Sequence, residues 1–170
     1  MLHRYESKLR KNYRVPQEVK FLILLPVLDV KGYKSPSVES WMGKINNNTI
    51  IPRKFLHVAF VSEFFGIVPL ELSSSFPMGQ YESIDTLEVN NKLYRNVEQK
   101  LETFFKLYGQ HYNKCGVLIP EKFMNQFNEE TDFTKKDIII SLFKKIRAIL
   151  SLNISVFDNL SGILKFFKGE

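Results

Sequence analysis

The stretch that decides the fold is FLILLP, residues 21–26, an unbroken apolar run that ends at a proline. Two further runs have the same character, FLHVAFVS at 55–62 and CGVLIP at 115–120. Strands that are covered on both faces show continuous rather than alternating apolarity, as in a parallel sheet. The three runs therefore predict three buried strands of a mainly parallel sheet.

Helical periodicity separates and follows these runs. Apolar residues recur at three- and four-residue spacing over 93–108, and Gly109 is a typical helix stop. Similar spacing predicts helices over 134–150 and 156–168. Strands that alternate with helices indicate an α/β protein built from βαβ units.

Length and composition favour one globular domain. The chain has 170 residues, of which 44% are apolar and 25% charged, and these shares are ordinary for a folded domain. We expect one domain over 1–170, with a basic segment at 1–20, a core at 21–150 and a C-terminal helix at 152–170. No apolar run approaches the roughly 18 residues that a membrane span needs, and the N-terminus has no apolar signal region. With one cysteine, we expect a cytoplasmic protein without an intrachain disulfide and without a membrane partner.

The net charge of +6 is concentrated at the two ends of the chain. Residues 1–20 carry six Lys/Arg against two acids, and residues 134–170 carry seven against three, so each end has a net charge of +4. This excess is compatible with a polyanion such as RNA. Of the 24 basic residues 18 are lysines, which suit phosphate contacts better than base reading. The alternative interpretation is a solvated surface that keeps the protein soluble.

Metal and nucleotide motifs are missing from the sequence. His3, His57 and His111 are far apart and have no second ligand at metal spacing, so we predict no metal. No Walker-type or dinucleotide-binding glycine motif occurs. His57 lies inside an apolar run, where a hydrogen-bonded core histidine is the favoured interpretation. Cys115 opens the third run and is expected to be a small buried residue.

The segment that follows the first strand, residues 25–41, concentrates polar side chains between two prolines. In open α/β sheets, ligands collect beyond the carboxyl ends of the strands. A serine here, Ser35 or Ser37, is suited to cap a helix over 38–45 and to aim its backbone N–H groups at an anion. The alternative is an ordinary surface loop. The polar residues are Asp29, Lys31, Tyr33, Lys34, Ser35, Ser37 and Glu39.

Three segments in this order resemble a known family. They are Pro26, Lys31 and Tyr33 after an apolar strand, then SEFFGIVPLEL at 62–72 and FPMGQYES at 76–83. Together they resemble the domain found in archaeosine synthase and related archaeal tRNA-guanine transglycosylase-like proteins, over about residues 13–120. The positions shared in the second and third segments are Ser62, Gly66, Val68, Pro69, Glu71, Leu72, Pro77 and Tyr81.

The resemblance implies a three-layer α/β/α domain with a central mainly parallel sheet, of the uracil-DNA-glycosylase-like fold. It also implies a role in archaeal tRNA modification. The family's enzyme attaches free lysine, through its side-chain amine, to the nitrile of 7-cyano-7-deazaguanine in tRNA, and a radical-SAM partner then completes archaeosine. The lysine step uses no metal and no cofactor in this family.

The hypothesis of an enzyme of this family assigns roles to individual residues, including residues such as Glu39 that differ from the family pattern. Lys31 and Tyr33 would orient the base or the lysine carboxylate, and Glu39 would act as acid and base. We expect the segment after the first strand to face the neighbourhoods of Ser62 and Tyr81 across one crevice. The substrate-binding residues would be Pro26, Ser35, Ser37, Ser62, Glu71 and Tyr81.

Departures from the family pattern leave several hypotheses open. Val27 stands where the family has cysteine, and Glu39 stands where it has histidine; Gly32 and Pro36 also differ from the pattern. A thiol and an imidazole are the polar reagents suited to this chemistry, so the alternative is a non-catalytic tRNA-binding or scaffolding subunit. The enzyme hypothesis is a stand-alone or split subunit, whose partner carries the transglycosylase-like or PUA domains. A protein-docking helix over 156–168 and a glycosylase inferred by fold analogy alone are the remaining hypotheses.

Overall fold

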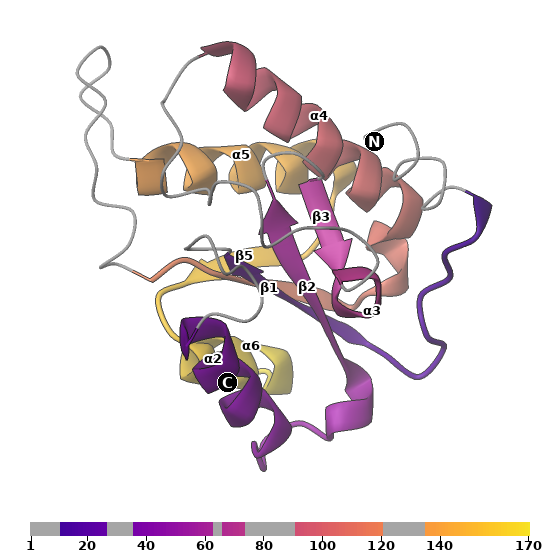
Figure 1. Ribbon diagram of the computed structural model, residues 1–170, viewed down its shortest axis with the longest axis vertical. Helices are drawn as coiled ribbons and strands as arrows, with labels where there is room; N and C mark the ends of the chain where they lie inside the picture. The colour runs from indigo at the N-terminus through magenta and orange to yellow at the C-terminus, as the bar shows by residue number, and fades with distance from the viewer. Residues whose placement is uncertain (1–10, 27–35, 63–65, 74–90, 121–134) are drawn as a thin grey trace.

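The computed structural model describes residues 11–26, 36–62, 66–73, 91–120 and 135–170 (Figure 1). The strands in these ranges are β1 (Phe21–Pro26), β2 (Leu56–Ser62), β3 (Gly66–Pro69), β4 (Lys114–Leu118) and β5 (Ile154–Phe157). The α-helices are α2 (Pro36–Asn46), α3 (Leu70–Ser73), α4 (Asn91–Tyr108), α5 (Lys135–Leu150) and α6 (Leu160–Lys168). Short 3₁₀ turns, η2 (Arg53–Phe55) and η4 (Gly109–His111), precede β2 and β4.

The strands form one five-stranded sheet in the order β3-β2-β1-β4-β5. Strand β1 pairs in parallel with both β2 and β4, and β4 pairs in parallel with β5. Only β3 is antiparallel among the described strands. The three apolar runs form β1, β2 and β4 at the centre of the sheet, which confirms the predicted mainly parallel α/β architecture.

Helices cover both faces of the sheet, with α4 and α5 on one side and α2 and α6 on the other (Figure 1). Successive residues of β1 alternate between the two cores. Leu22 and Leu24 pack in the cluster beneath α4 and α5, whereas Ile23 and Leu25 pack in the cluster beneath α2 and α6. Each buried side chain of this kind stabilises the fold by about 1.5–3 kcal/mol. Two covered faces therefore account for the unbroken apolarity of residues 21–26.

Strand β4 packs closely against α6 because residue 116 has no side chain. A Cβ at Gly116 would overlap the side chain of Ile163, which is fully buried on α6. The glycine therefore sets how near α6 approaches the sheet. The helix begins where Asn159 caps it, since the Asn159 Oδ1 accepts a 2.7 Å hydrogen bond from the Gly162 N–H.

The C-terminal region corrects one sequence prediction. A helix was expected over 156–168, within a C-terminal helix at 152–170, but residues Ile154–Phe157 form strand β5 and α6 begins only at Leu160. Phe157, which lies within the predicted helix, ends the strand instead. The apolar spacing of 156–167 fits a helix, but pairing with β4 stabilises the extended backbone of its first residues.

Strand β3 is also new relative to the prediction, which gave no strand after residue 62. The chain reverses after β2, and Gly66 takes a left-handed φ of 78° as β3 begins. Its short length, four residues, explains why periodicity did not reveal it. Because β3 runs back along β2, it carries residues 70–73 to the amino end of the parallel strands.

Among the described helices, none combines the length and the apolarity that crossing a bilayer requires.

Candidate active site at the carboxyl edge of the sheet

The carboxyl ends of the four parallel strands meet at one edge of the sheet. Pro26 ends β1 beside Val61, so the chain leaves β1 and β2 side by side. Strand β2 lies on one side of β1 and β4 lies on the other. Sheets of this kind bind ligands where the strand order reverses, and here the reversal falls between β1 and β4.

A hollow of about 430 Å³ opens at this edge. Its apolar wall consists of Leu118, Pro120 and Leu160, and hydroxyl, ammonium, carboxylate and amide groups surround that wall. Such a combination is typical of small-molecule sites. The residues that line the hollow are Pro36, Ser37, Ser40, Trp41, Lys44, Leu118, Pro120, Asp158, Asn159 and Leu160.

Helix α2 contributes one stripe of side chains to the hollow. Ser37, Ser40, Trp41 and Lys44 all line it, and their three- and four-residue spacing places them on one face of the helix. Ser37 was predicted as a substrate-binding residue, and the structure places it at the hollow. The other three residues were not predicted, although the same spacing, counted from Ser37, identifies them once a helix is assigned.

Glu39 lies off this stripe. It is two positions from Ser37, or about 200° around the helix axis, and its side chain is exposed. The structure therefore does not bring Glu39 to the hollow. Of the described residues that line it, Asp158 alone carries a carboxylate.

The remaining predicted residues fall into two groups. Pro26 is buried at the end of β1, and Ser62 ends β2 at the same edge of the sheet. Lys31, Tyr33, Ser35 and Tyr81 lie outside the described residues, so the structure does not test their predicted places across the crevice.

Glu71 is at the opposite end of the sheet from Ser62. It follows β3 on α3 and contacts His57, which lies five residues before Ser62 on β2. Five residues of strand span about 16 Å. Glu71 is thus separated from Pro26 and Ser62, although the resemblance predicted all three as substrate-binding residues.

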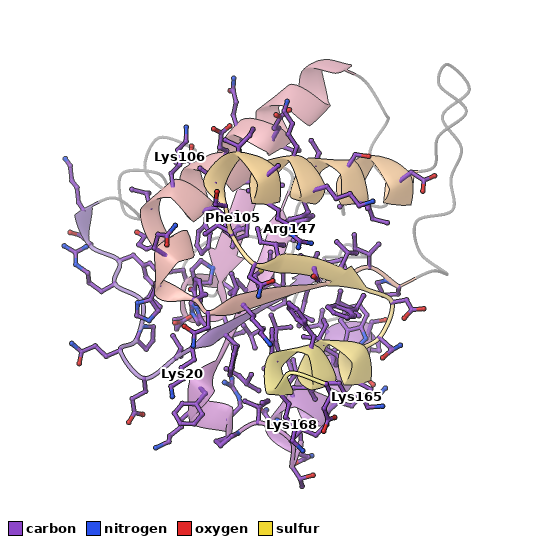
Figure 2. All side chains as sticks on the ribbon, turned by 180° about the vertical axis from the view of Figure 1, so that it is seen from behind. Lys20, Phe105, Lys106, Arg147, Lys165 and Lys168 are labelled. Atoms are coloured by element: carbon purple, nitrogen blue, oxygen red, sulfur yellow. The ribbon has the colours of Figure 1, made fainter. Side chains whose placement is uncertain are left out.

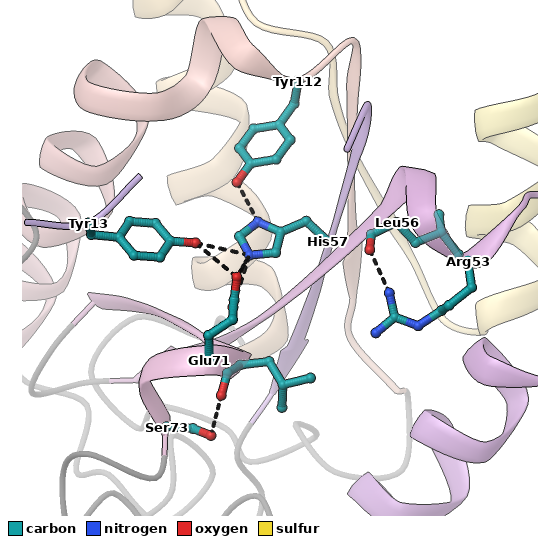
Figure 3. Close-up of polar contacts among 8 residues, drawn as sticks. Tyr13, Arg53, Leu56, His57, Glu71, Ser73 and Tyr112 are labelled. Carbon is teal, nitrogen blue, oxygen red and sulfur yellow. Dashed lines mark hydrogen bonds and ion pairs between the residues drawn. The ribbon is translucent and has the colours of Figure 1, made fainter. Parts of the chain in front are cut away.

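At this amino end, His57 joins Tyr13, Glu71 and Tyr112 in a polar cluster, the His57 cluster (Figure 3). The His57 Nε2 lies 2.8 Å from Glu71 Oε1 and 3.1 Å from Oε2. The Tyr13 hydroxyl donates a 3.3 Å hydrogen bond to Glu71 Oε1. The Tyr112 hydroxyl lies 2.6 Å from His57 Nδ1. An ionised carboxylate only accepts hydrogen bonds, so Nε2–H donates to Glu71 and, in the neutral imidazole, Nδ1 accepts from Tyr112.

The surroundings fix the charge states of the two phenols and of Glu71. Burial raises the pKa of the Tyr112 phenol, and burial together with the Glu71 charge raises the pKa of Tyr13. Burial also acts to raise the pKa of Glu71, but the hydrogen bond and charge of His57 outweigh it and hold that pKa below its usual range. The phenols are therefore neutral donors and Glu71 is a carboxylate.

The four residues of the His57 cluster come from four separate segments of the chain. Tyr13 precedes β1, His57 is on β2, Glu71 is on α3, and Tyr112 follows η4. Both ring nitrogens of His57 are hydrogen-bonded and its side chain is only 5% exposed. The structure confirms the interpretation of His57 as a hydrogen-bonded core histidine. Tyr13 and Tyr112 were missed because they are 44 and 55 positions away, and no local pattern links them.

Cys115 is buried in the core, as predicted. Burial raises the pKa of its thiol, so the thiol is kept protonated and unreactive. Within the described ranges, no group of three or more His, Cys, Asp or Glu side chains is arranged to hold a metal ion.

Comparison with known families gave a match over most of the chain. The family described as Domain of unknown function (DUF5591) matches residues 2–153. The chain belongs to the DUF5591 family. Neither a curated protein nor a solved structure matches the chain.

The DUF5591 match covers the whole of the His57 cluster but only part of the lining of the hollow. All four residues of the His57 cluster lie inside the matched residues, as does the α2 stripe. Asp158, Asn159 and Leu160, which close the hollow, lie beyond its end at residue 153. The hollow at the carboxyl edge is therefore completed by residues outside the matched segment.

Proposed function

We propose that this DUF5591 protein acts in archaeal tRNA modification, in the transfer of lysine to the 7-cyano-7-deazaguanine base of tRNA, as a stand-alone or split subunit. The observation that supports the proposal is the hollow at the carboxyl edge of the sheet. Pro26 and Ser62, which belong to the first and second motif segments, end β1 and β2 at this same edge, and Ser37 lines the hollow. A uracil-DNA-glycosylase-like fold is part of the same proposal, and helices on both faces of a mainly parallel sheet are compatible with it.

The proposed reaction is an addition. The lysine ε-nitrogen forms a bond to the nitrile carbon, one C–N π bond breaks, and a proton passes from the amine to the nitrile nitrogen, which gives an amidine. The atoms balance without an oxidant, a reductant or a nucleotide. The step needs a group that accepts and returns a proton and contacts that hold the amine against the nitrile.

The geometry favours Asp158 over Glu39 as the proton-transfer group. Asp158 lines the hollow, and its Oδ1 accepts a 2.8 Å hydrogen bond from Asn159 Nδ2, which fixes the carboxylate. Glu39 lies on another face of α2. Lys31, Tyr33 and Ser37 keep their proposed roles in binding the base or the lysine carboxylate, together with Pro26, Ser35, Ser62 and Tyr81.

A second function, non-catalytic tRNA binding or scaffolding, is favoured by a specific observation. Val27 replaces the cysteine of the family pattern, and the described lining of the hollow holds neither cysteine nor histidine. Cys115 does not compensate for this loss, because it is buried in the core. On this account the chain would hold tRNA for a partner that carries transglycosylase-like or PUA domains.

The test is incorporation of labelled lysine into tRNA that bears the nitrile base. The assay is run with the chain alone and with candidate partner subunits. We expect Asp158→Asn to reduce incorporation at least about 100-fold, in the range that general acid–base groups contribute. Glu39→Gln is the matched control and should change it less than about threefold.

Three outcomes separate the alternatives. Incorporation that depends on Asp158 supports the enzyme. Binding of tRNA without incorporation in any pairing supports the scaffold and removes the enzyme. Incorporation that is lost in Glu39→Gln and kept in Asp158→Asn contradicts the assignment of the proton-transfer group.

A further inference from the structure

We propose that the end of the molecule where η2, the start of β1 and the end of α6 meet binds the phosphate backbone of RNA. The surface consists of four lysines and two aromatic residues, Lys20, Lys54, Lys165, Lys168, Phe55 and Phe166, and is called here the basic–aromatic band. The inference rests on the proposed function, since tRNA is the partner of that function. It adds a surface that lies away from the hollow at the carboxyl edge.

One side of the band is built on Phe55. The Lys20 Nζ lies 4.5 Å from the centroid of the Phe55 ring, and the Lys54 Nζ lies 5.2 Å from it. The backbone fixes this arrangement, because the Lys20 N–H donates a 2.8 Å hydrogen bond to the Phe55 carbonyl. Cation–π attraction holds each ammonium group near the ring, so two positive charges gather at one place.

The other side of the band is the last turn of α6. Phe21, the residue after Lys20, stacks on Phe167 with ring centroids 4.8 Å apart. Lys114 anchors the same turn, since its Nζ donates a 2.6 Å hydrogen bond to the Phe166 carbonyl and lies 5.0 Å from the Phe166 ring. The negative end of the helix dipole stabilises the nearby charges of Lys165 and Lys168.

The charges of the band are available to a ligand. All four lysines are exposed. Among the described contacts, Lys168 alone of the four pairs with a carboxylate, at 3.3 Å from Glu170, and both of those side chains are 54% exposed. Such a surface ion pair contributes little and is readily exchanged for a phosphate.

Each basic end of the sequence contributes lysines to this band. Lys20 closes the N-terminal basic segment, and Lys165 and Lys168 belong to the C-terminal one. Figure 2 shows these three lysines in the half of the molecule that contains α6, and Lys106 and Arg147 in the half that contains α4 and α5. The fold therefore places Arg147 in one half of the molecule and Lys165 and Lys168 in the other.

The chemistry of the band favours RNA over a lipid surface. Phe55 and Phe166 are only partly exposed, and the exposed large apolar residues among those described, Leu107 and Ile149, lie on α4 and α5. A surface that inserts into lipid needs projecting apolar side chains beside its cations. Lysine ammonium groups match phosphates as point charges and carry no base-reading geometry.

The experiment compares two variants with the same net charge. In the band variant Lys20, Lys54, Lys165 and Lys168 are changed to Gln. In the control variant Lys106, Lys144, Lys145 and Arg147, all exposed on α4 and α5, are changed to Gln. Each change lowers the formal net charge by 4, from +6 to +2. Binding of an unmodified tRNA transcript is measured by fluorescence anisotropy over a series of KCl concentrations, after circular dichroism has verified folding.

We expect the band variant to bind at least about tenfold more weakly at 100 mM KCl. Its plot of log K against log salt should be shallower by about 3–4, because each lost phosphate contact removes about 0.9 from the slope. The control should bind within about threefold of the wild type.

The outcomes distinguish this inference from the proposed function. Equal losses in both variants, or a loss in the control alone, overturn the band while tRNA remains the partner. No tRNA binding by the wild type at low salt overturns both proposals. Binding to phosphatidylserine vesicles without binding to tRNA overturns the band as an RNA surface and identifies a lipid surface instead.

Discussion

At the scale of single residues, the His57–Glu71 pair is the feature with the clearest energetic consequence. The imidazole is buried and the carboxylate is 42% exposed, so water screens part of their attraction. Glu71 still supplies the hydrogen-bond acceptor for the buried Nε2 of His57, and a buried polar group without a partner lowers the free energy of unfolding. Glu71 therefore acts as a hydrogen-bond partner of the core and does not line the hollow.

Changing Glu71→Gln should lower the free energy of unfolding by about 1 kcal/mol at neutral pH, the usual net value of such a hydrogen bond. The folded state lowers the pKa of Glu71, so the carboxylate stabilises the fold above its unfolded pKa of about 4.3. That stabilisation is lost as the pH falls below about 4.3 through the folded pKa. Urea unfolding at pH 7 and over pH 2–5 measures both effects.

The matched control is Glu98→Gln, which removes an ion pair between the exposed Lys145 and the partly exposed Glu98. Glu98→Gln should lower the free energy of unfolding by no more than about 0.5 kcal/mol. If wild type and Glu71→Gln lose stability in parallel over pH 2–5, the role of the Glu71 carboxylate is disproved.

At the scale of elements, continuous apolarity predicted the strands that build the centre of the sheet, because helices cover both of its faces. The same logic failed for β3 and β5. Both have four residues, which is too short for periodicity to distinguish, and their backbone is set by pairing with β2 and β4. The missed reversal at Gly66 explains why Glu71 was grouped with Ser62, and the missed β5 explains why Asp158 was not considered.

The contact between β4 and α6 gives a prediction at this scale. Gly116→Ala places a methyl group against Ile163, and such overpacking costs about 1–3 kcal/mol. Gly43→Ala is the control, since a Cβ there meets no described atom within 4 Å and residue 43 lies within α2. Alanine at an open helical position should stabilise by about 0.5–1 kcal/mol. Thermal melts of both variants check the prediction, and a Gly116→Ala protein as stable as the wild type would refute it.

At the scale of the whole molecule, three polar features occupy different places on one sheet. The hollow is at the carboxyl edge, the His57 cluster joins four segments at the amino end, and the basic–aromatic band lies where α6 ends. Pro26 and Ser62 could be placed at the carboxyl edge from the sequence, since parallel strands end together. The band could not be predicted in detail, because it depends on contacts between residues more than 100 positions apart, such as Phe21 with Phe167.

The measurement that tests the central claim most directly is protection of a cysteine placed at the hollow. Ser37→Cys introduces a thiol there, and the native Cys115 is buried and should not react. The rate at which maleimide labels Cys at position 37 is measured in the presence of tRNA that carries 7-cyano-7-deazaguanine, and again in the presence of the same tRNA without that base. Ser141→Cys, on the exposed face of α5, is the control. We predict that only the tRNA with the nitrile base slows labelling at position 37, by about tenfold or more, and that labelling at position 141 is unchanged. Equal labelling of Ser37→Cys with both tRNAs would contradict a base-binding site at the carboxyl edge of the sheet.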